Sequence, residues 1–428
     1  MRKNWLWYQT FRYPIVKFGL HLFYKRIIIE GKERLPKKAP ILFVPNHQNS
    51  FMDALLVVTH VNPFIYFLTR AQAFNPPLMG KFLRSLNMLP VYRVRDGLSS
   101  VTKNNAIFDQ CIEYMKRDDA ILVFPEANHD LRRRVRPLSK GFTRIAFDAE
   151  VREGWNMNLH VIPVGLNYEE HRRSRNSVRV VFGEPILMKK YKELFEKDER
   201  EATAKLKEEV SEGIKKTIMH VPNLDHYPAH KILLDDLEKE SEAVINPKIV
   251  NKRVEELESH LNPEIVETAT TVYEIAEKND FSIKSIAGRK KPVLSMVLFF
   301  PFYLFSWFNN LIPYQPVRRI TTKLIKDHAF DASIKFILGM ILFPVFWLLI
   351  SLILWIAGVP DGYIQVYIGL SLMTSILFKD ANLMVREAKE RKRVKEFAQS
   401  HPEKHKQFEE GLKKLNEFRS KVFAYTEI

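Results

Sequence analysis

The sequence predicts an α/β fold, with a mostly parallel sheet flanked by helices, followed by charged helices and a helical membrane region. Over residues 26–187, short apolar runs alternate with longer stretches of helical periodicity, a pattern typical of strand–helix–strand units. The chain has only 15 glycines among its 428 residues, as expected of a helix-rich protein with few tight turns. Beyond residue 291, long stretches nearly free of charge indicate membrane helices.

The alternating region contains seven predicted strands and four main predicted helices. In parallel sheets, ligands bind beyond the carboxyl ends of the strands, so residues that follow a strand are the first candidates for chemistry. His47, Arg93 and Glu126 each follow one. The strands are predicted at Arg26–Glu30, Ile41–Pro45, Phe64–Thr69, Leu89–Tyr92, Ala120–Phe124, Val161–Gly165 and Val178–Phe182, and the helices at Phe51–Thr59, Leu78–Ser85, Thr102–Lys116 and Gly141–Glu150.

Net charge and cysteine content restrict the possible partners. Lys and Arg number 66 against 50 Asp and Glu, a net charge of +16, which favours an anionic partner. No nucleic-acid-binding motif accompanies this charge, and anionic lipid beside the uncharged stretches explains it, so we expect no nucleic acid partner. The single cysteine, Cys111, excludes an internal disulfide and a cysteine-based zinc site.

Changes in composition suggest five regions. Residues 1–34 interleave aromatic and basic side chains, which suits a helix at the membrane interface, although these aromatics could equally pack on the protein's own core. Residues 188–290 read as charged, solvated helices without a catalytic constellation. We expect an interface segment at 1–34, a catalytic domain at 35–187, a charged helical region at 188–290, a membrane region at 291–380 and a basic helical tail at 381–428.

The membrane region contains three apolar stretches. Residues 336–358 and 363–378 are joined by a turn carrying only Asp361, whereas Lys335 precedes the pair and Lys379 follows it. The positive-inside tendency therefore predicts a hairpin with both ends, and the catalytic domain, in the cytoplasm of a multi-pass protein. Residues 292–313 are flanked by basic residues on both sides, which favours a re-entrant segment over a span. A soluble helical core is the alternative for all three stretches.

The stretch from Asn46 to Asp53 carries the first chemical signal. His47 follows a predicted strand, and Asp53 lies in the first turn of the predicted helix. A carboxylate beside a histidine fixes its tautomer and stabilises the imidazolium, which suits a general base. Alternatively, Ser50 and Asp53 have the spacing of a capping box, which would explain the aspartate without catalysis.

Four blocks in order then resemble the glycerolipid O-acyltransferase family, which contains the lysophosphatidate and glycerol-3-phosphate acyltransferases. They are Asn46–Asp53, Leu89–Arg93, Phe124–Asp130 and Val161–Gly165, and the resemblance covers roughly residues 35–187. It implies that His47 deprotonates the acceptor hydroxyl and that Asp53 pairs with it. It also implies that Arg93 contacts the acceptor's phosphate, that Glu126 binds the glycerol moiety and that Pro163 is structural or near the acyl chain. Asn128, His129 and Lys140 join the expected substrate-binding residues, with Lys140 facing phosphate.

Two departures from the common family pattern point to a subgroup. Five residues separate His47 from Asp53 instead of four, and the third block continues as Glu-Ala-Asn-His-Asp. In both features the sequence resembles the fungal glycerol-3-phosphate and dihydroxyacetone-phosphate acyltransferases, which have the same spacer length and a His-Asp pair after the third block. One extra residue turns a helical position by about 100°, so the contact between His47 and Asp53 depends on where the helix begins.

We therefore expect a membrane-bound O-acyltransferase that moves an acyl group from acyl-CoA or acyl carrier protein to a glycerol-phosphate-type acceptor. The thioester is a substrate, so we expect no cofactor. A metal site built on Glu126, His129 and Asp130 is a weaker alternative, because their spacing is not distinctive, and we expect no metal. The alternative function is a non-enzymatic lipid-binding or membrane-tethering protein on a degenerate acyltransferase domain.

Overall fold

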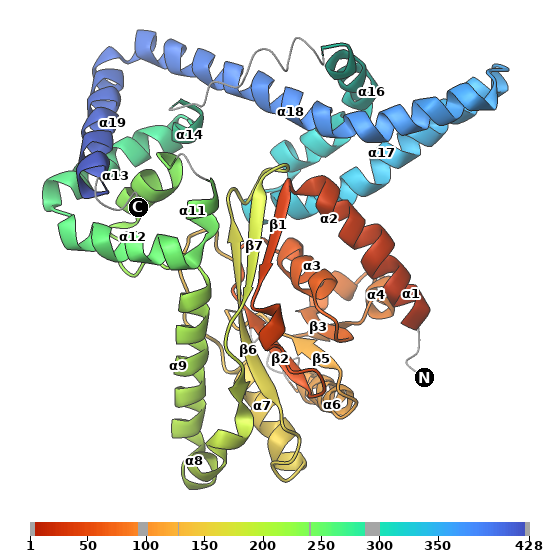
Figure 1. The fold of residues 1–428 in the computed structure, drawn as a ribbon, viewed down its shortest axis with the longest axis vertical. Helices are drawn as coiled ribbons and strands as arrows, with labels where there is room; N and C mark the ends of the chain where they lie inside the picture. Colours follow the sequence, from red (N-terminus) through yellow and green to blue (C-terminus); the bar gives the residue numbers. More distant parts are fainter. Residues whose placement is uncertain (1–4, 93–101, 127, 239–240, 287–299, 424–428) are drawn as a thin grey trace. The chain divides into compact units, whose positions relative to one another are not determined.

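The computed structural model describes residues 5–92, 102–126, 128–238, 241–286 and 300–423. The chain forms two compact units, Met1–His220 and Val221–Ile428, which we describe separately. The first unit contains the sheet and the second is helical (Figure 1).

The first unit is built on an eight-stranded mixed sheet. Its order is β1-β7-β6-β2-β5-β3-β4, with β8 paired to β6. The predicted parallel arrangement holds from β6 to β4, but β7 and β8 run antiparallel to β6, and β1 runs with β7. Only eight residues join β6 to β7, too few for the crossover that a parallel neighbour needs. The strands are β1 Arg26–Glu30, β2 Ile41–Pro45, β3 Ile65–Arg70, β4 Met88–Val91, β5 Ala120–Leu122, β6 His160–Tyr168, β7 Ser177–Phe182 and β8 Ile186–Leu187.

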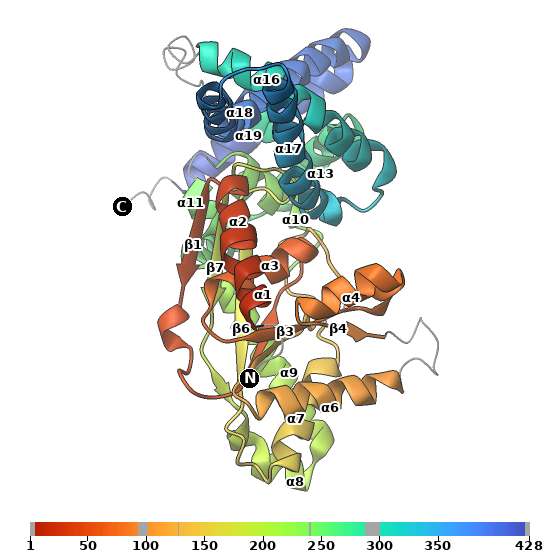
Figure 2. The same cartoon turned by 90° about the vertical axis from the view of Figure 1, so that its right-hand side faces the viewer.

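Helices cover the two faces of this sheet. Leu42 and Val44 of β2 belong to a core that contains the apolar sides of α6, α7 and α9. The alternate residue Phe43 points to the opposite face, as successive strand residues must, and its ring lies 5.9 Å from that of Phe182. Figure 2 shows α6 and α7 side by side below the strands. The main helices are α3 Phe51–His60, α4 Pro77–Ser85, α6 Lys103–Met115, α7 Gly141–Arg152 and α9 Glu199–Thr217, with the short α8 Lys192–Lys197 before α9.

The N-terminal segment has both a buried and an exposed side. It runs through α1 (Trp5–Thr10), a π-helical stretch from Phe11 to Lys17, and α2 (Phe18–Phe23). Arg12 is buried and donates to the carbonyl oxygens of Val61 and Pro63 after α3. One side of this segment packs on the protein's own core, as the second interpretation expects, while Trp5, Leu6, Trp7, Ile15 and Phe18 are exposed. The membrane-interface interpretation stays a prediction.

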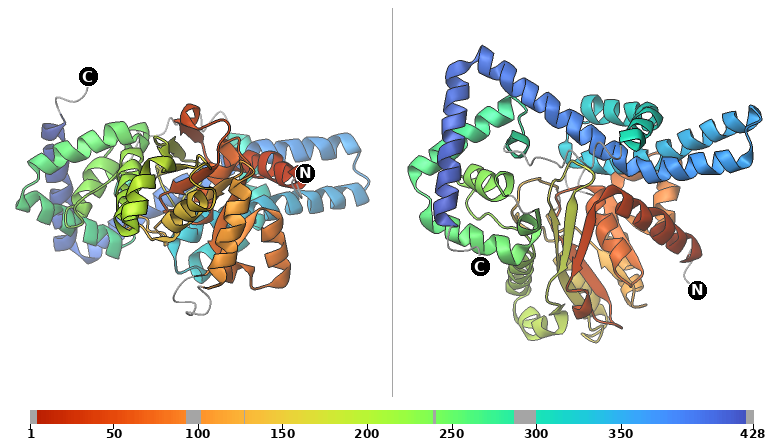
Figure 3. Two further views of the ribbon diagram at one scale, coloured as in Figure 1. Left: turned by 90° about the horizontal axis from the view of Figure 1, so that it is seen from below. Right: turned by 45° about the horizontal axis from the view of Figure 1, so that its top comes forward.

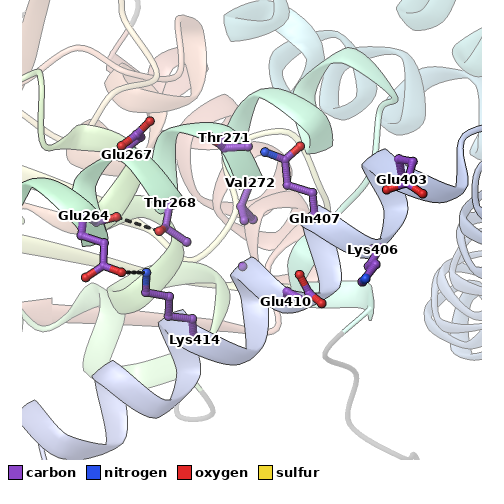
Figure 4. Close-up of a pocket in the computed structure, with 11 residues that line it drawn as sticks. Glu264, Glu267, Thr268, Thr271, Val272, Glu403, Lys406, Gln407, Glu410 and Lys414 are labelled. Carbon is purple, nitrogen blue, oxygen red and sulfur yellow. Dashed lines mark hydrogen bonds and ion pairs between the residues drawn. The ribbon is translucent and has the colours of Figure 1, made fainter.

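In the second unit, one group of helices contains α13, which packs against α10 and α19. A Cβ at Gly411 of α19 would come within 2.6 Å of Val272 on α13, so the two helices approach closely. An open groove between them is lined by carboxylates and lysines, and Lys414 pairs with Glu264 across it (Figure 4). The helices of this group are α10 Tyr227–His230, α11 Ser241–Ile245, α12 Pro247–His260, α13 Pro263–Lys278, α14 Ile283–Ile286 and α19 Pro402–Val422.

The remaining helices are α16 (Phe300–Arg319), α17 (Asp331–Ile356) and α18 (Asp361–Ser400). Figures 1 and 3 show α17 and the first part of α18 side by side. Asn310 accepts a hydrogen bond from Trp347 of α17 at 3.1 Å, and Asn309 accepts one from Tyr367 of α18 at 2.8 Å. The two asparagines thus join α16 to both neighbours.

Among the described helices, one is long and apolar enough to cross a membrane. It covers His328–Ile356 and has a mean hydropathy of 2.7 over its most apolar window. The predicted turn at residues 359–362 does separate α17 from α18, although α18 already begins at Asp361, and α18 continues well past residue 378. Residues 292–299 of the predicted re-entrant segment lie outside the described residues, and 300–313 belong to α16.

Candidate active site

The carboxyl ends of β2, β5 and β6 bring the first and third sequence blocks together. These strands are paired in register, with Phe43 of β2 opposite Leu122 of β5 and Ile162 of β6. The residues that follow β2 and β5 therefore meet at one edge of the sheet, as the sequence predicts.

His47 and Asp53 are in direct contact at this edge. The imidazole Nδ1 lies 2.9 Å from Asp53 Oδ2, and the Asp53 side chain is fully buried while His47 is 14% exposed. A hydrogen bond to the carboxylate places the proton of neutral His47 on Nδ1, which leaves Nε2 to accept a proton from a hydroxyl.

The five-residue spacer forms a turn before the helix starts. Asp53 Oδ2 also accepts hydrogen bonds from the backbone N–H groups of Gln48 at 2.9 Å and Asn49 at 2.7 Å. Ser50 has a φ of 46°, in the region that L-residues rarely adopt, and α3 begins directly after it. Since the extra residue lies in this turn, it does not rotate Asp53 away from His47.

The capping-box alternative does not describe this turn. Ser50 makes no side-chain cap hydrogen bond to α3. Asp53 instead binds N–H groups that precede the helix, so its carboxylate organises the turn and the imidazole together.

Asp53 has one further partner, on β6. The hydroxyl of Tyr168 donates to Asp53 Oδ1 at 2.5 Å, and both side chains are fully buried. Burial, followed by the charge of Asp53, raises the pKa of Tyr168 well above its usual value. The phenol therefore stays protonated and acts as a donor.

Residues of the third block also contact His47, through its ring and its backbone. The Phe124 ring stacks on the imidazole with centroids 3.9 Å apart and an interplanar angle of 18°. Glu126 accepts a 3.3 Å hydrogen bond from the His47 backbone N–H and pairs with Arg136 Nη2 at 3.0 Å. Burial raises the pKa of Glu126, and the charge of Arg136 opposes that shift.

The loop after Glu126 is fastened to the first block. The Asp130 N–H donates to the His47 carbonyl oxygen at 3.1 Å, and Gln48 Nε2 donates to the Arg132 carbonyl oxygen at 3.0 Å. Burial alone would raise the pKa of the Asp130 carboxyl, but the hydrogen bonds from Arg132 outweigh burial and lower this pKa. His129 lies edge-on to His47, with ring centroids 5.5 Å apart.

Of the other predicted substrate-binding residues, Asn128 and Lys140 are exposed. Asn128 is exposed, and its carbonyl oxygen accepts a hydrogen bond from Arg136. Lys140 is exposed at the start of α7, next to Ser139, whose N–H donates to the Pro125 carbonyl oxygen. Arg93 lies outside the described residues.

No local sequence pattern marks Arg136 or Tyr168 as a site residue. Arg136 is the last member of a basic run in which no spacing distinguishes one arginine from another. The predicted strand ended at Gly165, whereas β6 continues to Tyr168, and that extension carries the tyrosine to Asp53. In the described part of the chain, no group of three or more His, Cys, Asp or Glu side chains could hold a metal ion.

Comparisons with known proteins identify an acyltransferase segment in this chain. Residues 26–167 match the family model described as Acyltransferase. Over 123 residues, 28% of this chain, the sequence is 24% identical to glycerol-3-phosphate O-acyltransferase 2 of Saccharomyces cerevisiae. The match covers 16% of that yeast protein, so the chain spans about a sixth of the length of this curated relative.

A solved structure is also similar. The crystal structure of the 1-acyl-sn-glycerophosphate (LPA) acyltransferase PlsC from Thermotoga maritima covers 50% of this chain and 83% of its own chain. The sequence identity is 22% and the TM-score is 0.35.

Proposed function

We propose that the chain, through residues 26–167, is a member of the glycerolipid acyltransferase family, and that it acylates a hydroxyl of a glycerol-phosphate-type acceptor from an acyl thioester. The observation that carries this proposal is the 2.9 Å contact between His47 and buried Asp53. It holds a general base at the carboxyl ends of the strands, within the segment that matches the family.

The proposed reaction uses His47 twice. Its Nε2 takes the proton of the acceptor hydroxyl while the oxygen attacks the thioester carbonyl, and Asp53 stabilises the resulting imidazolium. The tetrahedral intermediate then expels the thiolate, which takes the proton from His47. One ester C–O bond forms and one C–S bond breaks, so the histidine returns to its neutral state.

We assign recognition of the acceptor's phosphate to cationic side chains around this pair. Arg136 is 16% exposed and is held by Glu126, which also contacts the His47 backbone. Because that carboxylate is already bonded to Arg136, we expect Glu126 to act by orienting Arg136. Guanidinium groups bind phosphate in a fixed, bidentate geometry. From the family resemblance, we also propose phosphate contacts for Lys140 and for Arg93, which lies outside the described residues.

The second part of the proposal is a membrane location. The apolar side chains of α17 are exposed along the helix, as Ile341, Leu348 and Leu352 illustrate. Such a surface suits lipid, and α17 has the length to cross a bilayer. We propose that α17 and the first part of α18 form a membrane hairpin with the catalytic unit in the cytoplasm.

An acceptor panel tests the proposed activity. The full chain in membranes should transfer label from acyl-CoA or acyl carrier protein to glycerol-3-phosphate, dihydroxyacetone phosphate or lysophosphatidate. The five-residue spacer favours the first two acceptors over the third. If no acceptor is acylated with either donor, the lipid-binding or tethering alternative replaces the enzyme.

A further inference from the structure

We infer that Tyr168 is a positioning residue for the catalytic base, acting through Asp53; this inference rests on the proposed function. The two oxygens of Asp53 have different partners. Oδ2 accepts from His47 and from two backbone N–H groups, whereas Oδ1 accepts from the Tyr168 hydroxyl at 2.5 Å.

The backbone fixes Tyr168 independently of Asp53. Tyr168 ends β6 opposite Val178 of β7, and its carbonyl oxygen accepts a 2.8 Å hydrogen bond from Arg133 Nη2. The hydroxyl therefore reaches Asp53 from the sheet, while the other donors reach it from the turn before α3. Contacts from two sides hold the carboxylate in one orientation.

This fourth donor also affects how strongly Asp53 attracts a proton onto His47. A hydrogen bond from Tyr168 shares the carboxylate charge, so the carboxylate stabilises the imidazolium less than it would with three donors. Without the hydroxyl, His47 should hold its proton to higher pH, and less of the free base should be present at a given pH. Tyr168 thus keeps the base available.

The chain supplies a matched control in Tyr24. Its ring lies 6.3 Å from that of Tyr168, and both rings are fully buried. In the described part of the chain, the Tyr24 hydroxyl has no hydrogen-bond partner. Tyr24→Phe therefore removes the same atom from the same region without removing a donor from Asp53.

The test compares Tyr168→Phe with Tyr24→Phe in the full chain. For Tyr168→Phe we expect kcat to fall about tenfold, KM to stay within about twofold, and the acid limb of kcat/KM to move up by about half a pH unit or more. Tyr24→Phe should match the parent protein. An unmoved acid limb in Tyr168→Phe, or an equal effect of both variants, would overturn the inference.

A second readout separates this inference from the proposed function. NMR of the imidazole signal of His47 gives the midpoint of its titration without any substrate. That midpoint should move up in Tyr168→Phe and not in Tyr24→Phe. If the parent protein acylates no acceptor, the proposed function fails, and this titration still decides whether Tyr168 acts through Asp53.

Discussion

At the scale of single residues, the site is a set of side chains that hold one another. His47 is bonded to Asp53, stacked on Phe124 and, through its backbone, bonded to Glu126. Glu126 in turn holds Arg136. The base and the Arg136 guanidinium therefore share one support, so a change at Glu126 should affect both.

Glu126→Gln tests that shared support. The amide keeps an acceptor but removes the charge from a pair whose carboxylate is 2% exposed. We expect a loss of about 2 kcal/mol in stability, because a buried ion pair with one partner neutralised leaves an uncompensated charge. Acyl transfer should fall at least about tenfold. Thermal midpoints in detergent micelles and initial rates measure the two effects.

Glu201→Gln is the control for this prediction. Glu201 pairs with Lys205 at 3.0 Å on α9, with both side chains about half exposed. Surface pairs of this kind contribute about 0.5 kcal/mol or less. Equal losses for the two variants would contradict a special role for Glu126.

His220 makes the first unit sensitive to acid. Burial, aided by Lys215, lowers the pKa of His220 to about 4, from 6.5. Its Nδ1 accepts a 3.1 Å hydrogen bond from the Val135 N–H, which a protonated nitrogen cannot do. The folded state binds fewer protons here than the unfolded state, so the stability from this group is complete above pH 6.5 and is lost as the pH falls towards 4.

His220→Gln should remove part of that pH dependence, because the amide oxygen can accept the same N–H without titrating. Between pH 7.5 and pH 5, we expect the parent to lose about 1 kcal/mol more than the variant, allowing for partial exposure of the imidazole. Hydrogen exchange of the β2 and β6 amides gives this difference. Parallel pH curves for the two proteins would show that His220 does not titrate in this way.

At the scale of elements, the fourth block is a packing surface for α9. A Cβ at Gly165 would come within 2.0 Å of the Thr217 carbonyl oxygen, and one at Gly213 would come within 2.5 Å of Pro163. Asn167 completes the contact by donating to the Thr217 carbonyl oxygen at 2.9 Å. Glycine is needed at both positions because the strand and the helix pack too closely there to leave room for a Cβ.

Gly165→Ala should therefore destabilise the first unit. The added methyl group meets backbone, which cannot move aside as a side chain does, so we expect a loss of about 3 kcal/mol. Gly141→Ala, at the start of α7, is the control. A Cβ added there would lie 4.0 Å from Ser139 Oγ, which is an ordinary van der Waals contact. That change should be neutral or stabilise by up to about 1 kcal/mol. Urea unfolding of both variants compares them.

Seven of the eight strands were predictable from sequence because each is a short apolar run, and most of their observed boundaries differ from the predicted ones by a residue or two. The two-residue β8 was not predicted, since it is too short to form a pattern. The pairing of His47 with Asp53 was expected from their positions at a strand end and a helix start, but the five-residue spacer left their contact dependent on where the helix begins. The turn at Ser50 was not predictable, since neither its positive φ nor the backbone N–H contacts of Asp53 has a local sequence pattern. Arg136 and Tyr168 were missed because long-range packing, with no local pattern, brings them to the site.

At the scale of the whole molecule, we propose a protein with a catalytic unit and a membrane hairpin. The polar contacts of Asn309 and Asn310 with α17 and α18 suit helices whose outer surfaces face lipid, where polar groups are satisfied between helices. Here apolar side chains cover the outside of the helices and polar side chains make contacts between them. In a soluble helix bundle, the apolar side chains lie between the helices and the polar ones face water.

Leu348→Lys combined with Leu352→Lys tests the hairpin. Both leucines are at least half exposed on α17, and a lysine at the centre of a span costs about 3 kcal/mol. We expect the parent protein to stay in the membrane fraction after alkaline carbonate extraction and the double variant to be released or degraded. Leu224→Lys with Ile249→Lys, at exposed positions of the same unit outside α16–α18, should behave like the parent. Parent protein in the supernatant would contradict the membrane hairpin.

The most direct test of the central claim is the rate of acyl transfer by His47→Ala in membranes, with the acceptor that the parent protein uses. His160→Ala is the matched control. His160 begins β6 and pairs with Ile41 at the start of β2, so it lies at the end of these strands away from the active site. Removal of a general base should lower kcat at least about a hundredfold, while the His160 variant should keep the parent rate. Full transfer by His47→Ala would contradict the assignment of His47 as the base.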